Sequence, residues 1–225
     1  MTTDLNLPAV ITNYWMWRGF SIRYQAAGTK GKAVVLIHGF GASSDHWRKN
    51  MTELGTEHRV YAIDLLGFGF SAKPTPGAEV TYTFETWAAQ IIDFCVEVAQ
   101  SPAFLVGNSI GCIVALQATV INPKLILGVA MLDCSLRLLH DRRRPQLPWY
   151  RRYSAPILQN VLNIKPLGYF FFSRLANPKV IKKVLLQAYK NPATVTDELV
   201  EILYQPSQTE GAADVFLAFI SYSQV

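Results

Sequence analysis

The residues Gly107-Asn108-Ser109-Ile110-Gly111 have a spacing at which a serine can act as a nucleophile. They follow the apolar segment 104–106 and precede the apolar run 112–121, so the pattern predicts a strand, a tight turn and a helix. Such a turn strains the serine backbone and exposes the Ser109 hydroxyl at the carboxyl edge of a sheet, and glycines on both sides leave room for the neighbouring strand and helix. The alternative is a glycine-rich turn with a serine that only caps the helix. With a second motif also present, we interpret Ser109 as a nucleophile for acyl transfer.

The second motif is His38-Gly39-Phe40-Gly41, directly after the apolar run 33–37. A carbonyl group under attack needs two N–H donors aimed at the developing oxyanion. We expect these donors to be the backbone amides of Ile110, which follows the nucleophile, and of Phe40. Gly39 would let this loop approach the nucleophile, and we expect His38 to brace the loop and not to act as the base.

The elements that must position these residues alternate between strands and helices. Continuous apolar runs predict buried parallel strands, and apolar spacings of three and four predict helices. The predicted strands are 14–18, 21–25, 33–37, 60–63, 104–106 and 127–132, with helices at 44–54, 84–99 and 109–121. This order predicts an α/β fold with a doubly wound, mostly parallel sheet and right-handed crossovers.

The pattern changes after Cys134. From there to Val225 the segments are amphipathic or irregular, prolines interrupt them, and none has the pattern of a strand. We therefore predict two parts, a core at 1–134 and a helical part at 135–225.

The two motifs, together with the stretch Asp64–Ser71, resemble the α/β-hydrolase superfamily. The resemblance covers about residues 14–133, and residues 135–225 resemble the lid that such enzymes insert after the sixth strand. A serine at position 109 argues against haloalkane dehalogenases and epoxide hydrolases, which use Asp there. For Asp64 itself we expect a carboxylate that shapes a turn.

Three stretches, LVGNSIGCIVALQAT, DLLGFGFSAKP and ELVEILYQPSQTEGAADVF, are similar to the chlorophyll dephytylase and pheophytinase group. This likeness implies a serine hydrolase of a lipophilic carboxylic ester, such as the phytyl ester of chlorophyll or pheophytin, through an acyl-enzyme on Ser109. The Gly-Asn-Ser start is also similar to carbon–carbon bond hydrolases of aromatic ring-cleavage products. A third alternative is a non-catalytic, ligand-binding member of the fold.

In this superfamily the chain order is serine, then acid, then histidine. The one histidine after Ser109 is His140, at the start of the lid, where the base is not expected. Asp133 ends its strand on the sheet edge of Ser109 and is a possible alternative acid. We expect about two further βα units, roughly 60 residues, beyond Val225, carrying the acid and the histidine. The 225-residue chain alone would then have negligible esterase activity.

Composition restricts the possible partners. Half of the residues are hydrophobic and 16% are charged, which predicts a large core, and the formal charge is +5. We expect neither a metal nor a cofactor, and three reduced, buried cysteines. The lid holds a cluster of cations beside two aromatic residues: Arg137, Arg142, Arg143, Arg144, Trp149, Tyr150, Arg151 and Arg152.

This cluster suits an anionic membrane surface, with a solvated loop as the alternative. No recognition module for nucleic acid accompanies the charge. The amino terminus lacks the pattern of a leader, so we expect a cytoplasmic protein, or one peripheral to a thylakoid-type membrane.

Overall fold

The computed structural model describes residues 7–134 and 164–222. Six strands form one sheet: β1 (Ile11–Trp17), β2 (Phe20–Ala27), β3 (Ala33–Ile37), β4 (Arg59–Ile63), β5 (Ala103–Asn108) and β6 (Ile126–Leu132). The helices are α1 (Arg48–Leu54), α2 (Phe84–Glu97), α3 (Ile110–Ile121), α6 (Lys165–Leu175), α7 (Pro178–Ala188), α8 (Asp197–Tyr204) and α9 (Ala212–Tyr222). Short 3₁₀ turns include η1 (Ser44–Trp47) and η5 (Gln205–Gln208).

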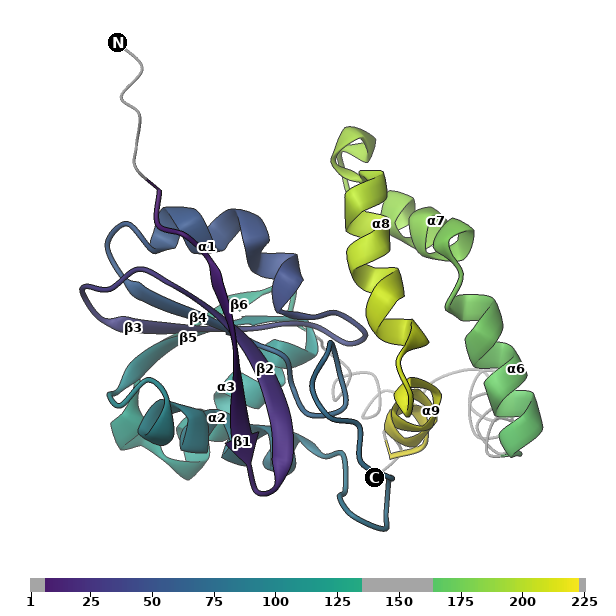
Figure 1. Cartoon of the computed structure of the whole chain (residues 1–225), viewed down its shortest axis with the longest axis horizontal. Coiled ribbons are helices and arrows are strands. Elements are labelled where there is room, and N and C mark those ends of the chain that lie inside the picture. Colours follow the sequence, from purple (N-terminus) through teal and green to yellow (C-terminus); the bar gives the residue numbers. More distant parts are fainter. Residues whose placement is uncertain (1–6, 135–163, 223–225) are drawn as a thin grey trace, which may run out of the picture.

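The strand order is β1-β2-β4-β3-β5-β6, and all neighbours from β4 to β6 are parallel. Strand β2 is antiparallel to both β1 and β4. Helix α1 covers one face of this sheet, and α2 and α3 cover the other (Figure 1). The predicted doubly wound, mostly parallel sheet is confirmed.

Strand β3 lies at the centre because both of its faces are apolar, and all five of its residues are buried. Val34 and Leu36 pack with Trp47 and Met51 beneath α1. Val35 and Ile37 pack on the opposite face in the larger core, which α2 and α3 complete. The carboxyl end of β3 therefore delivers the 38–41 loop from a rigid strand.

The first hairpin differs from the prediction by one residue. The turn consists of Arg18 and Gly19, whose φ angles are 50° and 87°. Two positive φ values match the twist of a two-residue hairpin. The predicted strands 14–18 and 21–25 place the turn at Gly19-Phe20, and this is wrong because Phe20 already belongs to β2.

Helices α6 to α9 form a layer beside the carboxyl edge of the sheet (Figure 1). Helices α7 and α8 share a small core of their own, made of Leu185, Val195, Leu199 and Val200. Helix α9 joins the main core through Val215 and Phe219. Within the described part, the segment after Cys134 is helical and contains no strand. The division at residue 134 remains a prediction.

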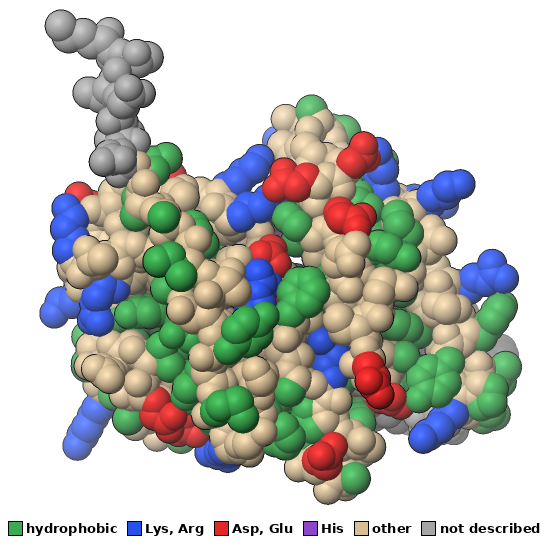
Figure 2. Space-filling view, in the orientation of Figure 1, with side chains coloured by type: hydrophobic (Ala, Val, Ile, Leu, Met, Phe, Trp, Pro, Cys, Tyr) green, Lys and Arg blue, Asp and Glu red, His purple; other side chains and the backbone are tan. Residues whose placement is uncertain are grey.

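Several expectations concern residues outside those described, namely the arginine cluster at 137–152 and His140. Cys95 and Cys112 are buried as expected, whereas Cys134 is partly exposed. No helix in the described ranges is both long enough and apolar enough to cross a membrane. On the face shown in Figure 2, acidic and basic side chains are interspersed.

Candidate active site

Ser109 joins the end of β5 to the start of α3 and has φ 53° and ψ −115°. A non-glycine residue at positive φ is strained, and such strain persists only where the surrounding structure enforces it. Here the enforcement includes a hydrogen bond of 3.0 Å from the Ser109 N–H to the Leu132 carbonyl at the end of β6. The predicted strand, turn and helix are therefore present, with Ser109 at the turn.

The flanking glycines are needed because backbone approaches them closely. A Cβ atom on Gly107 would lie 2.5 Å from the Cys112 nitrogen, and one on Gly111 would lie 2.4 Å from the Ile37 carbonyl oxygen. Both contacts are with backbone, which cannot rotate away. The two glycines thus let α3 pack directly against the ends of β3 and β5.

The Leu132 carbonyl accepts a second bond, from the Cys112 thiol at 3.4 Å, and that thiol is also 3.1 Å from the Gly107 carbonyl. Burial, with Cys134 beside it, raises the pKa of the Cys112 thiol to about 11. Cys112 is therefore a neutral thiol that ties the nucleophile turn to β6.

The 38–41 loop lies against the nucleophile turn. A Cβ atom on Gly39 would be 3.2 Å from the Ser109 Cβ, so a glycine allows the two segments to meet. In the described part of the chain the Phe40 amide donates no hydrogen bond, which leaves it open to a ligand. The Phe40 ring stacks on Phe219 of α9 at 4.6 Å, so the loop also contacts the helical layer.

His38 is fully buried and both of its ring nitrogens are engaged. Its Nδ1 lies 2.7 Å from the Gly39 carbonyl, which can only accept, and its Nε2 accepts the Leu65 N–H at 3.0 Å. This pattern requires a neutral ring protonated at Nδ1, and burial lowers the pKa of His38 accordingly. Geometry therefore favours the bracing role that we expect for His38.

The buried ring gives a pH dependence of stability. The unfolded chain binds a proton at His38 below about pH 6.5, whereas the folded chain does not until a lower pH. Acidification below that point therefore destabilises the fold, by up to about 1.4 kcal/mol per pH unit from this group. Urea unfolding at pH 7.5 and at pH 5 measures how much free energy of unfolding is lost on acidification. We expect H38N to lose less than wild type. Burial also lowers the pKa of His46. Because wild type and H38N both contain His46, its effect on stability is common to the two proteins. Equal slopes would contradict the prediction.

Asp64, at the end of β4, is the other buried polar residue that shapes the site. Its carboxylate accepts the Ser44 N–H at 2.6 Å and the Phe70 N–H at 2.8 Å, and lies 3.4 Å from Arg23. It therefore fixes two loops at once, the one after β3 and the one after β4. This agrees with the expectation of a turn-shaping carboxylate.

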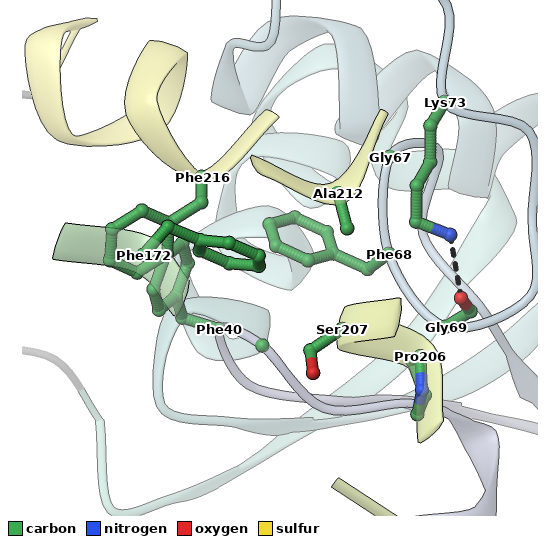
Figure 3. Close-up of a pocket in the computed structure, with 11 residues that line it drawn as sticks. Phe40, Gly67, Phe68, Gly69, Lys73, Phe172, Pro206, Ser207, Ala212 and Phe216 are labelled. Atoms are coloured by element: carbon green, nitrogen blue, oxygen red, sulfur yellow. Dashed lines mark hydrogen bonds between the residues drawn. The ribbon is translucent and has the colours of Figure 1, made fainter. Parts of the chain in front are cut away.

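An aromatic cavity of about 50 Å³ lies between the core and the helical layer. Its aromatic walls come from Phe40 and Phe68 of the core and from Phe172 and Phe216 of the helices, as Figure 3 shows. Phe172 belongs to the aromatic run 169–172, whose sequence predicts that a minority of its residues line a hydrocarbon pocket and that most form helix core. Phe172 lines the cavity, whereas the expectation of helix core is wrong for Tyr169 and Phe170, which are exposed. We call this space the aromatic cavity.

Lys73 also lines the aromatic cavity, and burial lowers its pKa to about 8. We expect one lysine ¹³Cε resonance to titrate near pH 8. The K73M variant should lack that transition. The absence of any lysine transition near pH 8 in the wild-type chain would contradict the prediction.

A second, wider groove of about 450 Å³ is lined by Asn108, at the end of β5, and by residues of η1 and α1. Asp133 lines it beside Leu132 and Asn108, so the structure places this candidate acid on the sheet edge of Ser109. Among the described residues, the Asp133 carboxylate has no hydrogen bond to a histidine. Its role as an alternative acid remains a prediction.

The sheet order and the strained serine between β5 and α3 are accompanied by similarity to known proteins. The sequence profile of the family described as alpha/beta hydrolase fold matches residues 32–194, which is well over half of the chain. The chain belongs to the alpha/beta hydrolase fold family. The predicted superfamily is thereby confirmed.

Two similar proteins and one solved structure indicate the range of this family. Pheophytinase, chloroplastic, of Arabidopsis thaliana is 26% identical over 88% of this chain and 48% of its own length. The 2-hydroxy-6-oxo-6-(2'-aminophenyl)hexa-2,4-dienoic acid hydrolase of Metapseudomonas resinovorans is 32% identical over 56% of this chain and 44% of its own length. The Cfl2 structure from Burkholderia cenocepacia superposes with a TM-score of 0.77 at 21% identity, over 98% of this chain and 73% of that one. The chain spans about half the length of these two relatives.

Sequence reasoning missed Lys73, Phe68 and Phe216 as cavity residues. Each lies far in sequence from the nucleophile, and none has a spacing that signals a site. All three do fall within the stretches that carry the resemblance, Phe68 and Lys73 in DLLGFGFSAKP and Phe216 in ELVEILYQPSQTEGAADVF, and this was the available signal.

Proposed function

We propose that this chain carries the nucleophile of a serine hydrolase that cleaves a lipophilic carboxylic ester. The observation that carries the proposal is the strained Ser109 between β5 and α3, against which Gly39 packs. The Ser109 oxygen attacks the ester carbonyl, and the amides of Phe40 and Ile110 stabilise the oxyanion. The alcohol leaves with a proton, and water then hydrolyses the acyl-enzyme to the free acid and Ser109.

The Ser109 proton must pass to a general base. His38 is unsuited to this role because its Nδ1–H and its Nε2 lone pair are both committed to backbone groups. We propose that the general base comes from outside the described residues. The carboxylate that orients this base either comes from outside them as well or is Asp133. His38 and Gly39 then position the 38–41 loop, which carries the Phe40 amide. Gly107 and Gly111 position the tight turn at Ser109.

The similarity to pheophytinase over most of the chain favours a phytyl ester of chlorophyll or pheophytin as substrate. The aromatic walls of the cavity beside Phe40 suit a hydrocarbon group. The similarity to a ring-cleavage product hydrolase favours a carbon–carbon bond hydrolase as the second candidate. A small-molecule substrate is common to both.

A direct comparison separates the two candidates. The protein, in the 225-residue form and in a form extended at the carboxyl terminus, is given pheophytin and, separately, a vinylogous 1,5-diketone. Release of phytol supports the ester reaction, and cleavage of the diketone alone overturns it. If a fluorophosphonate labels Ser109 and abolishes turnover, the protein is an enzyme; binding of either compound without turnover by any form would instead indicate a ligand-binding protein.

A further inference from the structure

Two cysteines lie together beside the nucleophile turn. Cys112 belongs to the first turn of α3 and is fully buried. Its Sγ lies 3.1 Å from the Gly107 carbonyl oxygen and 3.4 Å from the Leu132 carbonyl oxygen. Cys134 follows Leu132 by two residues, just beyond the end of β6. Helix α3 and the chain that leaves β6 therefore bring their cysteines to the same carbonyl group.

The two side chains also interact with each other. The Cys134 thiol is a hydrogen-bond partner of the Cys112 thiol. Asp133 has φ 48°, so the chain leaves the extended path of β6 immediately before Cys134. The pairing of β6 with β5 ends at Leu132 and Asn108, so Cys134 can approach Cys112 without breaking that ladder. A short movement then brings the sulfur atoms to the bonding distance of about 2.05 Å.

The two thiols differ in access and in reactivity. Burial raises the pKa of the Cys112 thiol to about 11, whereas Cys134 is partly exposed. The thiolate is the reactive form, and a buried thiol with a raised pKa holds little of it at neutral pH. A small oxidant therefore reaches Cys134 first, and Cys112 is placed to react with the oxidised sulfur that results.

We propose that Cys112 and Cys134 form a redox-active pair, in which a hydroperoxide oxidises Cys134 and Cys112 then closes a disulfide. In the first step the Cys134 sulfur attacks the O–O bond, which breaks, and a sulfenic acid forms while water or an alcohol leaves. In the second step the Cys112 sulfur attacks that sulfur, the S–OH bond breaks and water leaves. The pair loses two electrons and the peroxide gains them. This inference goes beyond the proposed function and does not depend on the reactivity of Ser109.

The disulfide would change how the nucleophile turn is held. In the reduced chain the Leu132 carbonyl accepts both the Cys112 thiol and, at 3.0 Å, the Ser109 N–H. Oxidation removes the S–H donor and replaces it with a covalent link between α3 and the chain after β6. That link also closes a loop and so restricts the unfolded chain. We therefore expect the Ser109 amide resonance to shift and the oxidised chain to unfold at a higher urea concentration.

The test counts thiols before and after oxidation. The reduced chain, which has three cysteines, is treated with hydrogen peroxide, and its remaining thiols are titrated with dithionitrobenzoate in urea. We expect the thiols of Cys112 and Cys134 to be lost and that of Cys95 to remain. The intact mass should fall by two hydrogens, a peptide map should show the link, and dithiothreitol should restore all three thiols. ¹H–¹⁵N NMR follows the Ser109 amide through the same cycle.

Three variants assign the roles within the pair. C134A should lose thiols at least about 10-fold more slowly than wild type, because both of its cysteines are buried. C112A should accumulate a sulfenic acid at Cys134, which dimedone traps, because the thiol that closes the disulfide is missing. The matched control is C95A, which removes another buried thiol, on α2, and should form the link like wild type.

Retention of all three thiols in wild type would overturn the inference, as would a link that joins the Cys134 residues of two chains. Oxidation of C134A at the wild-type rate would also overturn it. If C112A or C134A does not fold, the peptide map of the wild-type chain decides alone. Labelling of Ser109 by a fluorophosphonate is scored separately. A link in a chain with an unreactive Ser109 would refute only the proposed function, and a reactive Ser109 without the link would refute only the redox pair.

Discussion

Replacing Ser109 with alanine should reduce kcat for ester hydrolysis by a factor on the order of 10⁴ to 10⁶. The hydroxyl oxygen is the atom that forms the acyl-enzyme, so a methyl group in its place leaves only binding and the oxyanion donors. The measurement is the hydrolysis of a p-nitrophenyl ester by a form of the protein that turns it over. S173A is the matched control, because Ser173 is an exposed serine on α6 whose hydroxyl donates to the Phe170 carbonyl.

A second variant at the same position separates catalysis from folding. Glycine tolerates the φ of 53° that strains Ser109, so S109G should also be inactive but more stable than wild type by about 1 kcal/mol. Urea unfolding measures that difference. Turnover by S109A or S109G within 10-fold of wild type would refute the assignment of Ser109 as the nucleophile.

Replacing Asp64 with alanine should lower the free energy of unfolding by about 3 kcal/mol. Each of the two backbone amides that its carboxylate accepts, Ser44 N–H and Phe70 N–H, is left without that partner, at about 1–3 kcal/mol for a buried group. The loss of the contact with Arg23 is smaller, because Arg23 keeps two hydrogen bonds of 2.8 Å to Asp45. The variant D64N should be intermediate, since its amide retains one acceptor oxygen.

The control for Asp64 is E57A, which removes an exposed carboxylate from the pair with Lys30. An exposed ion pair contributes at most about 1 kcal/mol. Urea unfolding of the chain gives both values. If D64A lowered the free energy of unfolding no more than E57A does, the Asp64 carboxylate would not hold the loops after β3 and β4 together. Because Ser44 follows the oxyanion loop, D64A should also loosen the amide of Phe40 and lower turnover.

Local patterns sufficed to predict the sheet and the turn at Ser109. Strand β3 has its predicted bounds because its run of five apolar residues is buried when it forms a central strand that is covered on both faces. Helix α2 begins where Thr83 caps it, accepting the Thr86 N–H at 3.1 Å. These features depend on neighbours in the sequence, and so does the glycine spacing around Ser109.

Features that depend on distant packing were not predictable. The hairpin turn uses Arg18, a residue type that gives no signal for positive φ. Lys73 is partly desolvated because the residues around Gly211, more than a hundred positions later, pack against it. The aromatic cavity exists only because α6 and α9 meet the core, and no spacing within one segment reveals such a meeting.

One carbonyl group gives the site a mechanical property. The Leu132 oxygen accepts both the Ser109 N–H and the Cys112 thiol, and only Asp133, at φ 48°, separates Leu132 from Cys134. Two peptide units therefore join the shared acceptor carbonyl to Cys134. The position of Ser109 depends in this way on how the chain leaves the end of β6.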